Sequence, residues 1–206
     1  MSSSSSALGL RLLAAIAICL GSAWTAQAAP VTSAMATGGV TSQPIGHYDF
    51  CKTNRAECAI RPADQAPVRM TGALWAQLAK VNAAVNAAVQ PMNDIDIYGK
   101  DEVWTYPAQG VGDCEDYVLE KRRRLHRLGV SLSNLLITVV RKPDGEGHAV
   151  LTVRTSNGDF ILDNLTDKVR PWDETGYRFL KRQATDHTGR WVSIRDDQTV
   201  LVGSVQ

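Results

Sequence analysis

The sequence predicts an α+β fold in a single domain, in which two amphipathic helical segments precede a run of short strands. Residues 71–90 and 113–128 carry apolar side chains at three- and four-residue intervals, as helices packed on a core do. Residues 135–163 instead alternate and are rich in β-branched side chains, with turn-forming segments at 142–147 and 156–159. Strands joined by such short turns pair antiparallel, so this region predicts a three-stranded meander after a helix.

The composition fits one such domain and excludes several classes of partner. The chain has 206 residues, of which 44% are hydrophobic and 21% charged. That length buries a core without relying on disulfides. The 22 basic and 21 acidic residues give a net charge of +1, so the chain offers no global field for nucleic acid or an anionic membrane.

The first 28 residues read as a secretory signal peptide. Arg11 precedes an apolar run at 12–20, and small residues at 26–28 predict cleavage before Ala29. The alternative is a membrane anchor, but the run is about half of the ~20 apolar residues that a spanning helix needs. We therefore expect a periplasmic or secreted protein with no transmembrane segment in the mature chain.

Two segments precede the first long helix. Residues 29–46 are rich in Ala, Thr, Ser, Gly and Pro and predict a flexible N-terminal arm, which leaves 47–206 as the domain. Residues 47–68 predict an irregular loop that contains Cys51 and Cys58.

Three cysteines remain after the signal peptide, an odd number, so at least one of them has no intramolecular disulfide partner. In an oxidising compartment, Cys51 and Cys58 can close a small disulfide loop. The alternative is two unpaired, buried cysteines. If the two do pair, Cys114 is left over as a free thiol that needs an explanation.

The ends of both helices are marked in the sequence. Thr71 can cap the first helix and Pro91 ends it, after which residues 91–112 predict mainly loop. Asp113 can cap the second helix, and Gly129 stops it. The second helix also carries a basic face that we interpret as solvent-exposed, with an acidic partner as the alternative: Lys121, Arg122, Arg123, Arg124 and Arg127.

The strands are expected at residues 135–140, 148–155 and 160–163, with a further strand within 191–200. If Asn157 and Gly158 form the tight turn of the hairpin, His148 pairs with Asp167. Asp163 then lies on the same face as His148 but two cross-strand pairs away. A bulge or a twisted strand end would have to close that gap.

Cys114, His148 and Asp163 are the residues whose placement suggests chemistry. Cys114 falls in the first turn of a helix, where free N–H groups and the helix dipole favour a thiolate and can stabilise an oxyanion. His148 begins a strand and can act as a base, while Asp163 ends the next strand and can orient the imidazole. Each residue alone is more often structural: a buried thiol, a hydrogen-bonded histidine, a turn former.

Three ordered segments resemble the bacterial transglutaminase-like cysteine proteinases, the family of the LapG-like periplasmic proteases that release biofilm adhesins. They are GDCEDY at 112–117, GHAVL at 147–151 and LDN at 162–164. The resemblance covers about residues 70–180. It implies a papain/transglutaminase-like fold with Cys114 as nucleophile, His148 as base and Asp163, in preference to Asp167, as orienter.

The same resemblance implies calcium at Asp113 and Glu115, the acidic residues that flank the nucleophile. The residues themselves give a reason to expect a cation. Together with Asp116 they put three carboxylates around a thiol, which opposes thiolate formation unless a divalent cation compensates. The alternative is helix capping. Trp104, ten residues before Cys114, can line the site or pack in the core, and core packing is favoured.

These expectations combine into an exported cysteine endopeptidase that forms a thioester. The resemblance implies a surface adhesin as substrate and an inner-membrane receptor as regulator. The alternatives are acyl transfer to an amine or amidase chemistry with the same residues, and a non-catalytic binding module on this fold. A metal centre of Cys114, His148 and Asp163 is disfavoured because no Cys-x-x-Cys or His-x-x-x-His spacing accompanies them.

Overall fold

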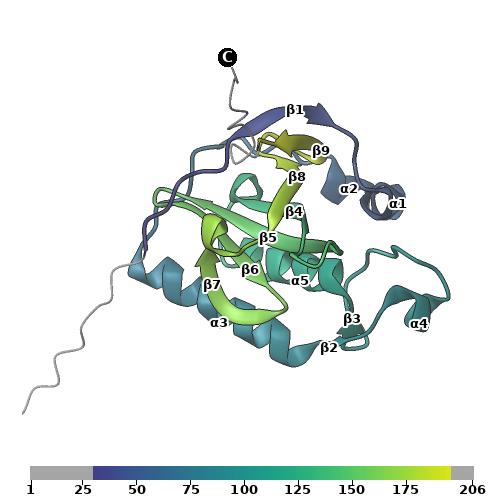
Figure 1. Cartoon of the computed structure of the whole chain (residues 1–206). Coiled ribbons are helices and arrows are strands. Elements are labelled where there is room, and N and C mark those ends of the chain that lie inside the picture. The colour runs from purple at the N-terminus through teal and green to yellow at the C-terminus, as the bar shows by residue number, and fades with distance from the viewer. Residues whose placement is uncertain (1–29, 196–206) are drawn as a thin grey trace, which may run out of the picture.

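The computed structural model describes residues 30–195 (Figure 1). The predicted signal peptide at 1–28, and the part of the expected strand 191–200 beyond residue 195, lie outside the described residues. No helix within 30–195 is both long and apolar enough to cross a membrane.

Most of the strands form one seven-stranded sheet in the order β1-β9-β8-β4-β5-β6-β7, in which every neighbouring pair is antiparallel. Its strands are β1 (Thr37–Thr41), β4 (Leu135–Arg141), β5 (Gly147–Thr155), β6 (Gly158–Asp163), β7 (Thr166–Pro171), β8 (Arg178–Ala184) and β9 (His187–Ile194). Two-residue strands β2 (Gln90–Pro91) and β3 (Val111–Gly112) pair parallel to each other.

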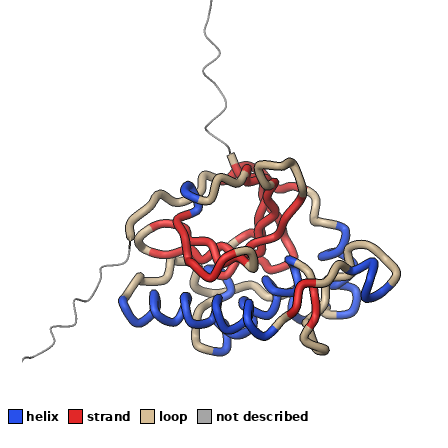
Figure 2. Tube along the Cα trace, turned by 60° about the horizontal axis from the view of Figure 1, so that its bottom comes forward, coloured by secondary structure: helices blue, strands red, loops and turns tan. Residues whose placement is uncertain are grey.

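The helices gather on one side of this curled sheet (Figure 2). They are α1 (Ile45–Thr53), α2 (Arg55–Cys58), α3 (Gly72–Ala88), α4 (Asp94–Tyr98) and α5 (Cys114–Arg127). There are also two 3₁₀ turns, η1 (Leu132–Asn134) and η2 (Trp172–Glu174), and Trp172 of η2 packs on the opposite face. Thr71 caps α3, since its hydroxyl accepts from the N–H of Leu74. The predicted α+β architecture is confirmed.

The core has two parts because side chains alternate across each strand. The larger part joins α3 and α5 to the sheet, with Ala149 and Leu151 of β5 among its buried members. The smaller part lies on the opposite face and includes Val150 and Ile161. Neighbouring residues of β5 therefore belong to different cores, and His148 falls on the same face as Val150.

The β5–β6 hairpin has a different register from the predicted one. Thr155 pairs with Gly158, so Ser156 and Asn157 form the two-residue turn. Gly158 is instead the first paired residue, with a φ of +104°. A Cβ atom there would lie 2.3 Å from the carbonyl oxygen of Thr32, so backbone packing explains this glycine.

Several segments expected to be irregular are ordered. Within the predicted flexible arm 29–46, Thr37–Thr41 form edge strand β1 and the side chain of Met35 is buried, so the described part of that prediction is wrong. The predicted loop 47–68 contains α1 and α2, and the predicted loop 91–112 contains α4 and β3. Packing on the sheet supplies the order of β1, α1 and α2 that local composition does not, whereas β3 pairs with β2 and contacts α5.

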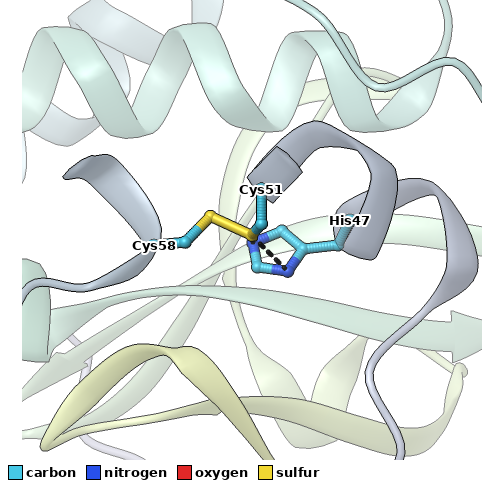
Figure 3. Close-up of side chains that lie close together, drawn as sticks. All are labelled: His47, Cys51 and Cys58. Atoms are coloured by element: carbon cyan, nitrogen blue, oxygen red, sulfur yellow. Dashed lines mark hydrogen bonds between the residues drawn. A yellow bond between two sulfur atoms is a disulfide. The ribbon is translucent and has the colours of Figure 1, made fainter. Parts of the chain in front are cut away.

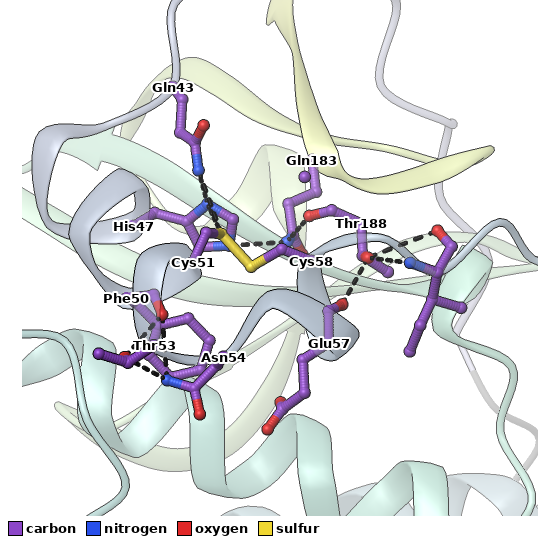
Figure 4. The surroundings of a disulfide bond; sticks show 12 residues. Gln43, His47, Phe50, Cys51, Thr53, Asn54, Glu57, Cys58, Gln183 and Thr188 are labelled. Carbon is purple, nitrogen blue, oxygen red and sulfur yellow. Dashed lines mark hydrogen bonds between the residues drawn. A yellow bond between two sulfur atoms is a disulfide. The ribbon is translucent and has the colours of Figure 1, made fainter.

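Cys51 and Cys58 form a disulfide that joins α1 to α2 (Figure 3). Around it, Thr188 of β9 donates its hydroxyl to the carbonyl of Glu57, and His47 lies against Cys51 (Figure 4). The disulfide therefore fastens the two short helices beside strand β9. Because both sulfurs are used in this bond, His47 and the two cysteines do not form a metal site.

The basic face predicted for α5 is only partly exposed. Lys121 is fully buried and Arg122 is 6% exposed. Arg122 donates its Nε–H to the carbonyl of Leu135, while Arg123 and Arg124 form ion pairs with Glu120. The helix is wedged between α3 and the sheet, so its polar side also packs against protein.

Candidate active site

Cys114 is the first residue of α5 and is half-buried, and it is the free cysteine among residues 30–195. Its side chain packs against the larger part of the core, which includes Ala149 of β5. The chain enters the helix through Gly112, where a Cβ atom would lie 2.6 Å from Oδ2 of Asp116. Asp113 occupies the N-cap position in an extended conformation, but its side chain makes no capping hydrogen bond, contrary to the predicted role.

His148 and Asp163 are in direct contact. Nε2 of His148 lies 2.9 Å from Oδ1 of Asp163, and both side chains are buried. The observed register explains this contact. If the pairing is continued by one residue, Asp163 falls opposite Val150, diagonally next to His148 on the same face. The predicted gap of two cross-strand pairs does not exist.

The structure brings two of the three predicted residues together, His148 and Asp163. His148 uses Nε2 toward Asp163, so Nδ1 is the ring nitrogen left for another partner. Ala149, the next residue along the strand, belongs to the part of the core against which Cys114 packs. A thiol, an imidazole and a carboxylate are the groups that nucleophilic acyl transfer by a cysteine uses.

The Asp163 carboxylate is held by several donors. Burial alone would raise its pKa, but hydrogen bonds from His148 and Tyr177, together with the charge of His148, hold the pKa below its ordinary value. Tyr177 donates its hydroxyl to Oδ2 at 2.6 Å, and the N–H of Leu165 donates to Oδ1 at 3.1 Å. Asp163 is therefore an ionised partner for an imidazolium.

The Cys114 thiol has a raised pKa in this structure, whereas the helix position predicted a lowered one. Burial is the main cause, followed by the carboxyl groups of Glu115 and Asp113. The sulfur donates to Oε2 of Glu115 at 3.1 Å. Burial, reinforced by the neighbouring carboxylates, therefore disfavours the thiolate in this structure, as expected when those carboxylates are uncompensated.

The predicted cation ligands Asp113 and Glu115 belong to a larger acidic cluster. Carboxylate oxygens of Asp94, Asp113 and Glu115 lie within 4.8 Å of one another. Burial raises the pKa of Asp113 to about 6 and that of Glu115 to about 9. Asp113 raises the pKa of Glu115 further, whereas the hydrogen bond with Glu115 lowers that of Asp113. Burial also raises the pKa of neighbouring Asp116 to about 8.

The oxygens of this cluster fit a hard divalent cation. Among the described residues, Oδ1 of Asp94, Oδ1 of Asp113 and Oδ2 of Asp116 are buried without a hydrogen-bond donor. Buried carboxylate oxygens without donors are costly, and oxygen ligands suit Ca²⁺. Asp94 was not predicted because it lies 19 positions before Asp113 in a segment that read as loop.

Trp104 and Tyr177 are two further aromatic residues whose positions the structure settles. Trp104 is 6% exposed and packs edge-on against His47 and Trp191, which places it in the core. Tyr177 was not predicted, although it contacts Asp163. It lies 29 positions after His148, and no local pattern marks it.

The comparisons with known proteins agree with this geometry. Residues 37–199 match the family model of the bacterial transglutaminase-like cysteine proteinases. No curated protein matches the chain at the threshold applied.

Solved structures of Legionella pneumophila LapG also match. The calcium-bound form has a TM-score of 0.50 and 26% identity, covering 58% of this chain and 68% of that one. The EGTA-treated form has a TM-score of 0.50 and 26% identity, covering 62% and 74%. Because the family model spans the sheet and both long helices, the chain belongs to the bacterial transglutaminase-like cysteine proteinases and is a cysteine protease.

Proposed function

We propose that this protein is an exported endopeptidase that hydrolyses a peptide bond through Cys114, His148 and Asp163. The observation that carries the proposal is the 2.9 Å contact between Nε2 of His148 and Oδ1 of Asp163, next to Ala149, a member of the core against which Cys114 packs. The signal-peptide pattern of residues 1–28 supports export.

The chemistry follows from these positions. The Cys114 sulfur gives its proton to His148 and attacks the peptide carbonyl carbon. Free N–H groups in the first turn of α5 stabilise the oxyanion. The His148 imidazolium, paired with Asp163, protonates the leaving amine as the C–N bond breaks. Water then hydrolyses the thioester, with His148 as the base, and the thiol is restored.

We propose that Asp113 and Glu115 hold calcium, with Asp94 and Asp116 as the neighbouring carboxylates. The unpartnered oxygens of the cluster and the match to a calcium-bound LapG support this assignment. Bound calcium would supply positive charge that compensates these carboxylates. With Glu115 engaged as a ligand, its carboxyl would no longer raise the pKa of the Cys114 thiol.

The substrate and regulator are proposed from the family likeness. A LapG-like protease in the periplasm would process a cell-surface adhesin and would be controlled by an inner-membrane receptor. The substrate is a protein in any case, because the family consists of proteases. The match to LapG, which covers 68% of the LapG chain, supports an adhesin over other protein substrates.

The test is the pH–rate profile of Cys114 alkylation by iodoacetamide, in the chain without residues 1–28. Cys114 is then the one cysteine outside the disulfide. With calcium, the wild type should react rapidly at or below neutral pH, and His148→Ala should lose that reactivity. Replacing calcium by EGTA should slow the wild type, because uncompensated carboxylates disfavour the thiolate.

His126→Ala is the matched control, because His126 is exposed at the far end of α5. It should react like the wild type. Slow alkylation with an apparent pKa near the ordinary ~8.5 in wild type and His148→Ala alike would contradict the proposal. Product analysis with an added amine would then separate hydrolysis from acyl transfer.

A further inference from the structure

Tyr177 lies in the connection between η2 and β8, directly after Gly176, whose φ is +75°. Its hydroxyl donates to Oδ2 of Asp163 at 2.6 Å. Its ring meets the imidazole of His148 edge-on, with 5.7 Å between ring centroids and an interplanar angle of 73°. One side chain from outside the β5–β6 hairpin therefore contacts both members of the His148–Asp163 pair.

We propose that Tyr177 is a positioning residue of the protease, which fixes the orientation of the Asp163 carboxylate and covers the His148–Asp163 hydrogen bond. The inference rests on the proposed function, since it concerns the same imidazole and carboxylate. It adds a residue that reaches neither Cys114 nor the substrate directly and that acts through Asp163.

The hydrogen bonds of Asp163 show how its orientation is fixed. Oδ1 faces His148 and also accepts the N–H of Leu165. Oδ2 accepts the hydroxyl of Tyr177. With a separate donor on each oxygen, the carboxylate cannot rotate without breaking a charge-assisted bond, so Oδ1 stays directed at Nε2 of His148.

Other charged groups near Asp163 come from different elements. Lys121 of α5 is buried, and its charge interacts with both Asp163 and Asp167. Lys168 and Arg170 of β7 line the small hollow beside Asp163. These groups remain in a variant that removes only the hydroxyl of Tyr177, so they do not obscure its effect.

The ring of Tyr177 lies between two hollows of the surface. One, of about 720 Å³, is also lined by Trp172, Arg178 and Phe179. The other, of about 20 Å³, is lined by Asp163 and Tyr177 together. Removing the ring would connect the larger hollow to the carboxylate, and water there would weaken the hydrogen bond to His148.

Two substitutions separate these contributions. Tyr177→Phe keeps the ring and removes the hydroxyl, whereas Tyr177→Ala removes both. Tyr106→Phe is the matched control, because the half-buried Tyr106 also donates its hydroxyl to a carboxylate, that of Glu57, at 2.5 Å. All are measured by iodoacetamide alkylation of Cys114 across pH in calcium, with thermal unfolding of each variant.

Tyr177→Phe should slow alkylation at neutral pH by roughly tenfold, the effect of one hydrogen bond to a charged group. Its acid limb should move to higher pH, because Asp163 loses a donor that holds its pKa below the ordinary value. Tyr177→Ala should lose more than Tyr177→Phe. Tyr106→Phe should change neither the rate nor the acid limb.

A Tyr177→Phe profile identical to that of the wild type would overturn the inference, as would a slower rate with an unmoved acid limb. Equal losses in the Phe and Ala variants would overturn the role of the ring. If wild-type alkylation is independent of His148, the proposed triad fails and this inference falls with it. If His148 matters and Tyr177 does not, only the inference fails.

Discussion

At the residue scale, His47 is buried among donors rather than acceptors. Its Nδ1 accepts the indole N–H of Trp191 at 3.2 Å, and the amide nitrogens of Gln43 and Gln183 face the two ring nitrogens. The orientation of Gln183 is fixed, because its oxygen accepts the N–H of Ile137. A protonated ring would therefore lack an acceptor among these groups.

Acid should unfold the protein partly through this residue. Burial, followed by the charge of Arg122, lowers the pKa of His47 from 6.5 to about 3. A histidine with a lowered folded-state pKa contributes stability that is present above pH ~6.5 and is lost as pH falls toward ~3. At full loss this is on the order of 5 kcal/mol.

His47→Gln keeps a hydrogen-bond acceptor and removes the titrating ring. Its melting temperature should therefore fall less steeply between pH 6.5 and 4 than that of the wild type. The measurement is thermal unfolding across pH, with His126→Gln as a control at an exposed position. Parallel curves for the wild type and His47→Gln would show that His47 is not responsible for the acid sensitivity.

At the element scale, α5 supplies several functions from adjacent turns. Its first turn carries Cys114 with the acidic residues, and its second buries Lys121 beneath the sheet. Among the described residues, the Lys121 ammonium is buried without a hydrogen-bond partner, and burial lowers its pKa to about 7. Because α5 lies between α3 and the sheet, little of its surface is exposed to solvent, and some of its charged side chains are buried.

The α1–α2 unit should depend on its disulfide. Cys51→Ser with Cys58→Ser opens a loop that spans seven residue positions. The chain-entropy relation gives a loss of about 2.5 kcal/mol. For a protein of this size that lowers the melting temperature by roughly 5–10 °C. Scanning calorimetry of the variant, with Cys114→Ser as the single-cysteine control, measures the effect.

An unchanged melting temperature in the double variant would mean that the contacts of Thr188 alone hold these helices beside β9. Cys114→Ser should itself melt near the wild type, because the substitution conserves volume closely. It should abolish alkylation at the same time, which separates the structural cysteines from the reactive one.

At the scale of the whole molecule, the buried acidic cluster and the buried His47 change the stability of the fold in opposite directions as pH changes. The acidic cluster has raised pKa values, from about 6 for Asp113 to about 9 for Glu115. Carboxyls with raised folded-state pKa contribute stability that is full below pH ~4 and is lost as pH rises through those values. His47 has the opposite dependence.

Without calcium, the melting temperature should therefore be highest in mild acid and should decline toward pH 9. Calcium should remove most of that decline, because it binds the ionised carboxylates of the folded chain and adds about 2.7 kcal/mol at one hundred times its Kd. Glu115→Gln should melt higher than the wild type in EGTA and gain little from calcium. A wild-type curve that calcium does not change would contradict the proposed site.

The sequence alone determined the parts of this protein that depend on local chemistry. Apolar spacing located α3 and α5, and alternation with turn residues located β4, β5 and β6. The three short segments around Cys114, His148 and Asp163 were sufficient to indicate the family, which the family match confirms. The number and spacing of the cysteines allowed a Cys51–Cys58 disulfide, and the structure decided between that bond and two unpaired thiols.

Only the tertiary structure decided what distant segments do to one another. The closure of the hairpin at Ser156 and Asn157 brought Asp163 to His148, whereas a turn at Asn157 and Gly158 would have left the two residues two cross-strand pairs apart. Asp94 joined Asp113 and Glu115, and Tyr177 joined Asp163, from segments without a pattern of their own. Burial then reversed the expected pKa of Cys114, because desolvation and neighbouring charge depend on packing in three dimensions rather than on sequence neighbours.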